Sequence, residues 1–288
     1  MCQVYKWWGN KNEPPPHLKT RKQLAEIGMK PVKPVGVIRL QEYELYLYDP
    51  NDSESATPKK KASAVQLEAL AKGREIQKLN RQRSEWYSRI GRFLEDKNSA
   101  IEWARKQLKK RKWVILDTET TGLNDAEIVQ IGIIDREGKT VFDSLIKPTI
   151  AIPKEVIAIH SITNEAVANA PIFPEIYPQI VEALQKKQVL IYNANFDISI
   201  LNYCCKLHKL PLLRLDKRCD CVMEWYAQYC GEWSEYYGSY KWQPLNGKHN
   251  VIDDCLATLN LIQAMAYDET IDLEASFQEY ITEDVTKR

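Results

Sequence analysis

Two carboxylates stand two residues apart at the end of an apolar run, in Trp113-Val-Ile-Leu-Asp-Thr-Glu119. Such a run predicts a buried strand, and the period of two places Asp117 and Glu119 on one face of it. Neighbouring carboxylates that have lost water repel each other, and a divalent cation removes the conflict. The pair therefore indicates a metal site, with a cap or turn before Gly122 as the alternative.

Two later segments carry groups of the same kind. Asp197 follows an apolar run and stands in the first turn of a predicted helix, where a lone Asp is usually a cap or a partner of the helix dipole. His249 precedes another predicted helix, and Asp254 lies within it beside an apolar face. Carboxylate oxygens suit Mg²⁺ or Mn²⁺ rather than zinc, and an imidazole suits general base catalysis. Together the segments indicate metal-dependent chemistry, although each is weak alone.

Taken in order, the motifs resemble those of the DEDDh exonucleases, a family of the ribonuclease-H-like fold that includes the proofreading subunit of bacterial DNA polymerase. Residues 117–123 are similar to the family's Asp-x-Glu-Thr-Thr-Gly-Leu, and residues 193–197 to its Asn-Ala-x-Phe-Asp. His249 and Asp254 match the ends of His-x-Ala-x-x-Asp, and residues 159–163 resemble Ile-His-Gly-Ile-Thr. The resemblance covers about residues 113–266.

Three positions depart from the family pattern. Ser161 stands where Gly is usual, Tyr192 where His is common, and Val251 where Ala is usual. None of them removes an acid or the base, so the departures leave only the shape of the pocket open.

The resemblance implies a 3′–5′ exonuclease that binds single-stranded 3′ ends and releases nucleoside 5′-monophosphates. Two Mg²⁺ or Mn²⁺ ions would be held by the four carboxylates, Asp117, Glu119, Asp197 and Asp254, and His249 would be the general base. Contacts to the terminal nucleotide are expected from Thr118, Gly122, Leu123, His160, Asn193 and Phe196. Local packing is the alternative for Leu123, and a helix cap is the alternative for His160.

The predicted elements that position these residues give an α/β fold. Strands are expected at 112–116, 126–134, 140–146, 188–192 and 213–222, and helices at 154–159, 173–184, 196–207, 223–230 and 251–266. Three strands in succession, followed by alternating helices and strands, predict a mixed sheet with helices packed on it. The resemblance implies the same ribonuclease-H-like arrangement.

The charge distribution divides the rest of the chain. Residues 59–112 hold 17 Lys and Arg against 6 Asp and Glu, whereas residues 113–288 hold 15 against 26. We expect a small N-terminal region at 1–58, a basic helical segment at 59–112, the exonuclease domain at 113–270 and a C-terminal tail at 271–288. The basic segment is either a solvated linker or an arm that follows nucleic-acid phosphates.

Other features limit the function classes. The seven cysteines form neither a disulfide framework nor zinc-ligand spacing, and no apolar run is long enough to cross a bilayer, so we expect a cytoplasmic protein. The aromatic residues of 225–242 either fill a core or stack on bases. DNA is the favoured substrate, in replication or repair. The alternatives are an RNA-directed exonuclease, or a nucleic-acid-binding protein with little activity alone that docks on a polymerase or another replication or repair protein through 1–112.

Overall fold

The computed structural model describes residues 2–245 and 247–286, and the side chains of 284–286 are not described. Met1, Asn246 and residues 287–288 lie outside this part, so the ends of the predicted N-terminal region and C-terminal tail do too. The chain forms two compact units, Met1–Leu79 and Asn80–Arg288. None of the helices among the described residues combines the length and the apolar character that a bilayer span requires.

The first unit is built from short strands around a small core. A four-stranded sheet has the order β1-β4-β5-β2, formed by Gln3–Tyr5, Gly36–Arg39, Glu44–Tyr48 and Lys19–Thr20. Strands β4 and β5 form an antiparallel pair. Helix α1 (Arg21–Glu26) starts at a capping box on Thr20, and β3 (Met29–Pro31) pairs with β6 (Ala56–Pro58). Helix α2 (Ala64–Trp86) begins in this unit.

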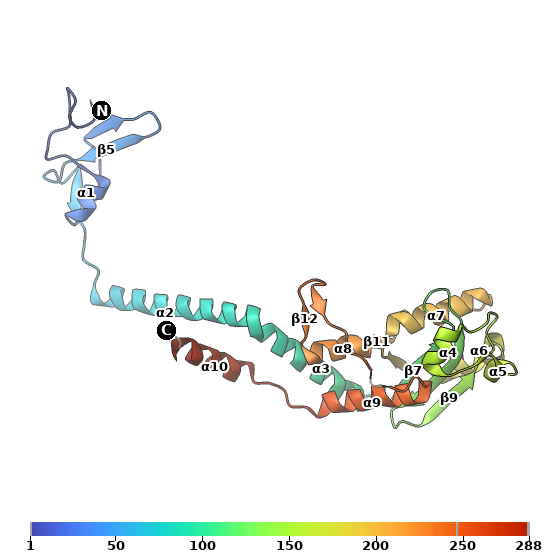
Figure 1. The fold of residues 1–288 in the computed structure, drawn as a ribbon. Coiled ribbons are helices and arrows are strands. Elements are labelled where there is room, and N and C mark those ends of the chain that lie inside the picture. Colours follow the sequence, from blue (N-terminus) through green and yellow to red (C-terminus); the bar gives the residue numbers. More distant parts are fainter. Residues whose placement is uncertain (1, 246, 287–288) are drawn as a thin grey trace. The chain divides into compact units, whose positions relative to one another are not determined.

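The second unit contains the five-stranded mixed sheet that the sequence predicts (Figure 1). Its order is β11-β10-β7-β8-β9, formed by Cys219–Cys221, Gln188–Ile191, Trp113–Thr120, Ile128–Asp135 and Thr140–Leu145. The pairs β7–β8 and β8–β9 are antiparallel, whereas β10 is parallel to both β7 and β11. This is the ribonuclease-H-like arrangement, and the central strand β7 is the one that carries Asp117 and Glu119.

Helices cover both faces of this sheet. Val114 and Leu116 of β7 pack with α6 (Phe173–Leu184) and α7 (Ala194–Leu207). Trp113 and Ile115 point the other way and pack with α3 (Arg92–Lys109), α8 (Val222–Cys230) and α9 (Val251–Tyr267). Each fully buried aliphatic side chain of these clusters contributes roughly 1.5–3 kcal/mol to folding. Because successive side chains alternate, this packing fixes the face on which each residue of β7 lies.

Three elements differ from the sequence-based expectation. The strand predicted at 213–222 is only β11, preceded by a 3-10 turn at Leu215–Lys217, because Arg214 has a left-handed backbone with φ 49°. The basic segment 59–112 contains two helices joined by a π-helical turn, Tyr87–Gly91, and α3 is part of the sheet-covering layer. The helix predicted at 154–159 is α4 (Lys154–His160), and a short helix that was not predicted, α5 (Asn164–Val167), follows it before α6.

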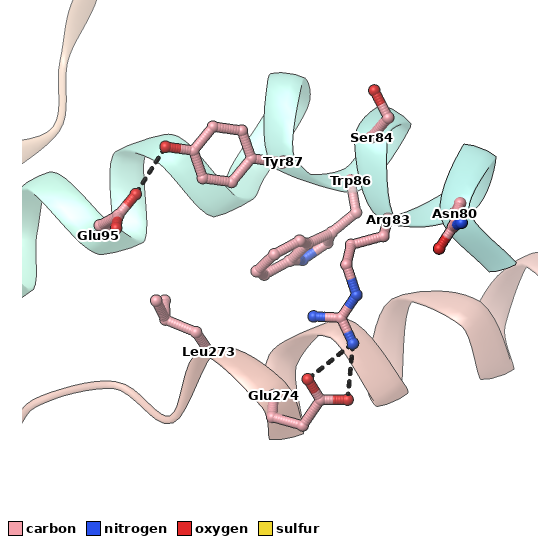
Figure 2. Close-up of a pocket in the computed structure, with 8 residues that line it drawn as sticks. All are labelled: Asn80, Arg83, Ser84, Trp86, Tyr87, Glu95, Leu273 and Glu274. Carbon is pink, nitrogen blue, oxygen red and sulfur yellow. Dashed lines mark hydrogen bonds and ion pairs between the residues drawn. The ribbon is translucent and has the colours of Figure 1, made fainter.

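The predicted tail contains helix α10 (Leu273–Thr286), which packs on the end of α2. Phe277 is fully buried, its ring 5.6 Å from that of Trp86, and Arg83 forms a two-pronged hydrogen bond with Glu274. Figure 2 shows Trp86 between the two helices and Arg83 reaching toward α10. Gly91 makes this possible, because a Cβ there would lie 2.6 Å from the Trp86 ring.

Candidate active site

Asp117 and Glu119 lie on the same face of β7, the one covered by α9. Asp117 is opposite Gly132 of β8 and Glu119 is opposite Gln130, and a register shift follows directly after Glu119. Both carboxylates are half-buried. Because the strand before them is fully buried, these charges stand at the edge of a core and are not ordinary surface groups.

Asp197 reaches the same place from α7. Its side chain is buried, and its Oδ1 accepts a hydrogen bond of 2.7 Å from the hydroxyl of Thr118. The N-cap position of α7 belongs to Asn193. Asp197 is therefore not the N-cap of α7, although it stands in the first turn, where the alternative of a partner for the helix dipole also places it.

Asp254 is carried by the first turn of α9. Asn250 caps this helix, with its side chain accepting from the backbone of Ile252 and Asp253. The Asp254 carboxylate is buried and accepts a 2.8 Å hydrogen bond from the backbone N–H of Lys248. This contact needs Gly247, because a Cβ there would stand 1.9 Å from Asp254 Oδ1.

His249 lies in the loop before α9, directly ahead of the N-cap Asn250. Its side chain is exposed, and its backbone is left-handed with φ 55°. One ligand atom from each of Glu119, His249 and Asp254 lies within 4.8 Å of the others. A loop residue and two core carboxylates thus meet at one point, where an imidazole nitrogen faces oxygens of the cluster.

A second glycine lets α9 approach the sheet. A Cβ on Gly132 would lie 2.7 Å from Cγ2 of Val251, the first residue of α9. Gly132 is also the residue paired with Asp117. The Val251–Gly132 contact therefore sets how closely the helix that carries Asp254 lies against the strand that carries Asp117.

Burial disfavours the charged form of all four carboxylates, and for Asp117 and Glu119 the neighbouring carboxylates add to this effect. Burial, followed by the charges of Asp197, Asp254 and Glu119, raises the pKa of Asp117 well above its usual range. Burial and the charges of Asp254 and Asp197 raise the pKa of Glu119 to about 7. Burial also raises the pKa of Asp197 to about 7, against the hydrogen bond from Thr118, and it raises the pKa of Asp254.

No Lys or Arg among the described residues forms an ion pair with this cluster; Lys248 instead lies 3.6 Å from Asp253. A cluster of buried carboxylates with no cationic partner is the donor set that divalent cations neutralise. The oxygens of Asp117, Glu119, Asp197 and Asp254 are hard ligands of the type that Mg²⁺ and Mn²⁺ prefer. The residues present therefore fit the divalent metals that the sequence implied.

The residues expected to contact a nucleotide differ in how far their side chains are exposed. Leu123 is 77% exposed, so it has no local packing role, and Gly122 is half-buried beside it. Thr118 is buried under the cluster and Phe196 is half-buried against the α6–α7 core, whereas Asn193 is half-buried at the start of α7. The substrate contacts of all these residues stay predictions.

His160 connects α4 to the end of β7. Its Nδ1 accepts from the backbone N–H of Ile162, which leaves the proton on Nε2 to be donated to the carbonyl of Thr120 at 3.2 Å. Burial lowers its pKa, which favours the neutral ring. Ser161 follows with φ 63°, which explains why glycine is usual there. His160 thus supports the turn that carries Gly122 and Leu123.

Sequence reasoning did not identify Gly132 or Gly247 as parts of the site, and it named Tyr192 only as a departure from the family pattern. The Tyr192 hydroxyl donates to the carbonyl of Gln243 at 2.5 Å and so anchors the loop that leads to His249. A signal existed only for Gly132, since a glycine inside an apolar strand often marks a close approach.

Comparison with known proteins identifies a family and several relatives. The family model described as RNase_T, Exonuclease, matches residues 114–262. An uncharacterized exonuclease, CP81, of Escherichia phage 186 is 37% identical over 186 residues, which cover 59% of this chain and 95% of the phage protein. The DNA polymerase III subunit epsilon of Pasteurella multocida is 33% identical over 101 residues, 31% of this chain and 40% of that subunit. The chain thus spans less than half of that relative.

A solved structure, exonuclease X in complex with 5′ overhanging duplex DNA, is 26% identical and covers 55% of this chain and 95% of its own, with a TM-score of 0.38. The family match and the phage relative define the class of protein as a nuclease. The chain belongs to the exonuclease family, and within it to the DEDDh type of 3′–5′ exonuclease.

Proposed function

We propose that this exonuclease removes nucleoside 5′-monophosphates one at a time from 3′ ends of nucleic acid, with DNA favoured over RNA. The observation that carries the proposal is the convergence of Asp117, Glu119, Asp197 and Asp254 from three elements, each with a raised pKa. His249 stands at the exposed side of this cluster, where a substrate and water have access.

Two divalent ions held by the four carboxylates would stabilise the attacking and leaving oxygens of the scissile phosphodiester. His249 takes the proton of the attacking water at an imidazole nitrogen. Imidazole suits this role because its proton exchange falls near neutral pH. Thr118 keeps Asp197 oriented, and the backbone of Lys248 does the same for Asp254.

The exposed Leu123 lies beside the first acids and is proposed to contact the terminal base, with Gly122 allowing the nucleotide to approach. DNA is favoured because several relatives are named DNA polymerase III subunit epsilon, which also suggests replication or repair and a polymerase-like partner. Residues 1–112 would then provide the docking region. The boundaries 1–58, 59–112, 113–270 and 271–288 stay part of this proposal.

The test is digestion of single-stranded DNA and RNA, labelled at either end, with Mg²⁺, Mn²⁺ or EDTA. Metal-dependent shortening from the 3′ end is expected, with loss of activity in Asp117→Asn. Asp253→Asn is the matched control, because Asp253 is in the same turn of α9 as Asp254 but pairs with Lys248 outside the cluster. Equal activity of wild type and Asp117→Asn would refute the proposed site. Faster digestion of RNA would favour the exoribonuclease alternative.

A further inference from the structure

A hairpin lies between α8 and α9 (Figure 1). Its strands β12 (Trp233–Ser234) and β13 (Ser239–Tyr240) are antiparallel. The rings of Trp233 and Tyr240 lie 5.3 Å apart, and each is about 6 Å from Phe93 of α3, at 6.1 and 6.0 Å. Arg92 lies 4.6 Å above the Trp233 ring, and the Tyr240 hydroxyl donates to Asp96. The stem is thereby fixed to the start of α3.

The aromatic residues beyond the stem face water. Tyr236 is 88% exposed, Tyr237 is 77% exposed and Trp242 is 69% exposed. Trp225 of α8, by contrast, stacks on Trp103 and fills the core. Some aromatic residues of 225–242 therefore pack in the core, and others are exposed to solvent. A cluster of large exposed aromatic side chains marks an interaction site, because leaving them in water has no benefit for folding.

The hairpin also forms a cavity of 590 Å³, lined by Ser234, Tyr237, Ser239, Tyr240, Lys241 and Trp242. This volume lies within the range of about 300–1,000 Å³ that small organic ligands occupy. The lining combines aromatic faces, two serine and two tyrosine hydroxyl groups, and the ammonium group of Lys241, which lies 3.8 Å from the Glu232 carboxylate. The aromatic faces and hydroxyl groups match the base of an unpaired nucleotide, whose face stacks on rings and whose edge forms hydrogen bonds.

The segment that lines the cavity leads directly, in the sequence, into the loop that carries His249. Gln243, directly after Trp242, is anchored by Tyr192, which follows β10 and directly precedes Asn193 of the site. His249 is seven residues beyond Trp242 in the sequence, so the two lie at most about 25 Å apart. A single strand of several nucleotides spans such a distance.

We propose that the hairpin, residues 233–242, is a second nucleotide-binding site that holds an unpaired base of the substrate strand several nucleotides away from its 3′ end. This inference rests on the proposed exonuclease function and assigns a recognition site to it. Stacking uses the π-face of a base and does not require a basic surface, so Glu232 and Glu235 do not oppose it. The site would make the enzyme prefer longer single strands to very short ones.

The test compares two substrates in the full-length protein. One is a long single-stranded oligonucleotide, and the other is a small chromogenic nucleoside phosphodiester that fills the active site alone. In Tyr237→Ala and Trp242→Ala we expect KM for the oligonucleotide to rise between about 5-fold and about 100-fold, which is the range for loss of one stacked base. KM for the small substrate should stay as in wild type. Tyr237→Phe should behave like wild type, because it keeps the ring.

Tyr267→Ala is the matched control, since Tyr267 is 82% exposed at the other end of α9. Binding of a fluorescent oligonucleotide to the Asp117→Asn protein gives the same comparison without turnover. Unchanged oligonucleotide affinity in both hairpin variants would overturn the inference. The exposed aromatic surface of residues 233–242 would then be assigned to a protein partner. If wild type cleaved neither substrate but the hairpin variants lost oligonucleotide binding, the proposed function would fail while the second site stood.

Discussion

The hydroxyl of Thr118 on β7 donates a 2.7 Å hydrogen bond to the carboxylate of Asp197 on α7, 79 residues further along the chain, and both side chains are buried. Thr118 lies on the face of β7 opposite to Asp117 and Glu119. The central strand therefore contributes to the carboxylate cluster from both of its faces. One face carries the carboxylates of Asp117 and Glu119, and the other carries the Thr118 hydroxyl, which orients the Asp197 carboxylate.

Thr118→Val should weaken metal binding while keeping the shape of the side chain. Removing the donor leaves Asp197 without the hydrogen bond that favours its charged form. Loss of such a supporting contact typically costs about 10- to 100-fold in metal affinity or activity. Titration calorimetry with Mn²⁺ measures the affinity. Thr118→Ser should restore it, and Thr140→Val, on the exposed part of β9, should have no effect. Wild-type affinity in Thr118→Val would remove the proposed role.

Gly132→Ala should move α9 away from β7. Its new methyl group would lie 2.7 Å from Val251, and overpacking of this kind costs about 1–3 kcal/mol. We expect a lower free energy of unfolding in urea, together with reduced exonuclease activity because Asp254 is displaced. Gly132→Ala combined with Val251→Ala should recover both. Gly73→Ala, where a Cβ meets nothing within 4 Å, is the control. A stable but inactive double variant would argue against this explanation.

The sequence predicted the parts of the site that depend on local pattern. Asp117 and Glu119 could be placed on one face because strand periodicity needs only neighbouring residues. The contacts between Gly132 and Val251, and between Gly247 and Asp254, depend on the distance between elements, which periodicity does not contain. The roles assigned to the site residues stay predictions.

Elements were missed where their local signal is short or misleading. Strands β12 and β13 have two residues each and are held by Phe93 of α3, a contact far away in sequence. The predicted strand 213–222 was too long, because the left-handed backbone of Arg214 and the 3-10 turn that follows it interrupt the extended chain. Helix α10 depends on burial of Phe277 against Trp86, which the composition of the C-terminal residues does not reveal.

Stability should depend on pH and metal together. Glu119 and Asp197 have pKa values raised to about 7, whereas exposed carboxyl groups titrate near about 4. Between these values the metal-free folded state binds more protons than the unfolded state, so its free energy of unfolding falls as pH rises. Metal binds the charged form, so the gain in Tm on adding Mg²⁺ should be larger at about pH 8 than at about pH 5.5.

Scanning calorimetry with EDTA or Mg²⁺ at both pH values makes this comparison. Glu119→Gln removes one of the carboxyl groups with a raised pKa. In this variant the free energy of unfolding of the metal-free protein should fall less as pH rises. An equal or larger gain in Tm at the lower pH would contradict the expected coupling.

His249→Asn should slow turnover and leave metal binding largely intact. Asparagine tolerates the left-handed backbone of φ 55° at this position, so the turn that positions Asp254 should persist. Loss of a general base typically lowers the rate by about 10²- to 10⁴-fold. Single-turnover digestion gives the rate, and calorimetry with Mn²⁺ gives the affinity. An unchanged rate would remove His249 from the base role, whereas loss of metal affinity would make it a ligand instead.

The basic segment 59–112 should contribute to nucleic-acid binding through charge. Lys59, Lys60 and Lys61 precede α2. Within the part of the chain that the structure describes, none of the three forms an ion pair. If they contact phosphates, each removes a condensed counterion, and the dependence of log K on log salt should lose about 0.7 per contact for a single strand. Replacing all three with Gln should therefore lower that slope by about 2 in the Asp117→Asn protein. A control replaces Lys139, Lys147 and Lys154 instead. Equal slopes in wild type and the 59–61 variant would support the linker reading of the segment, because a solvated linker releases no counterions from the strand.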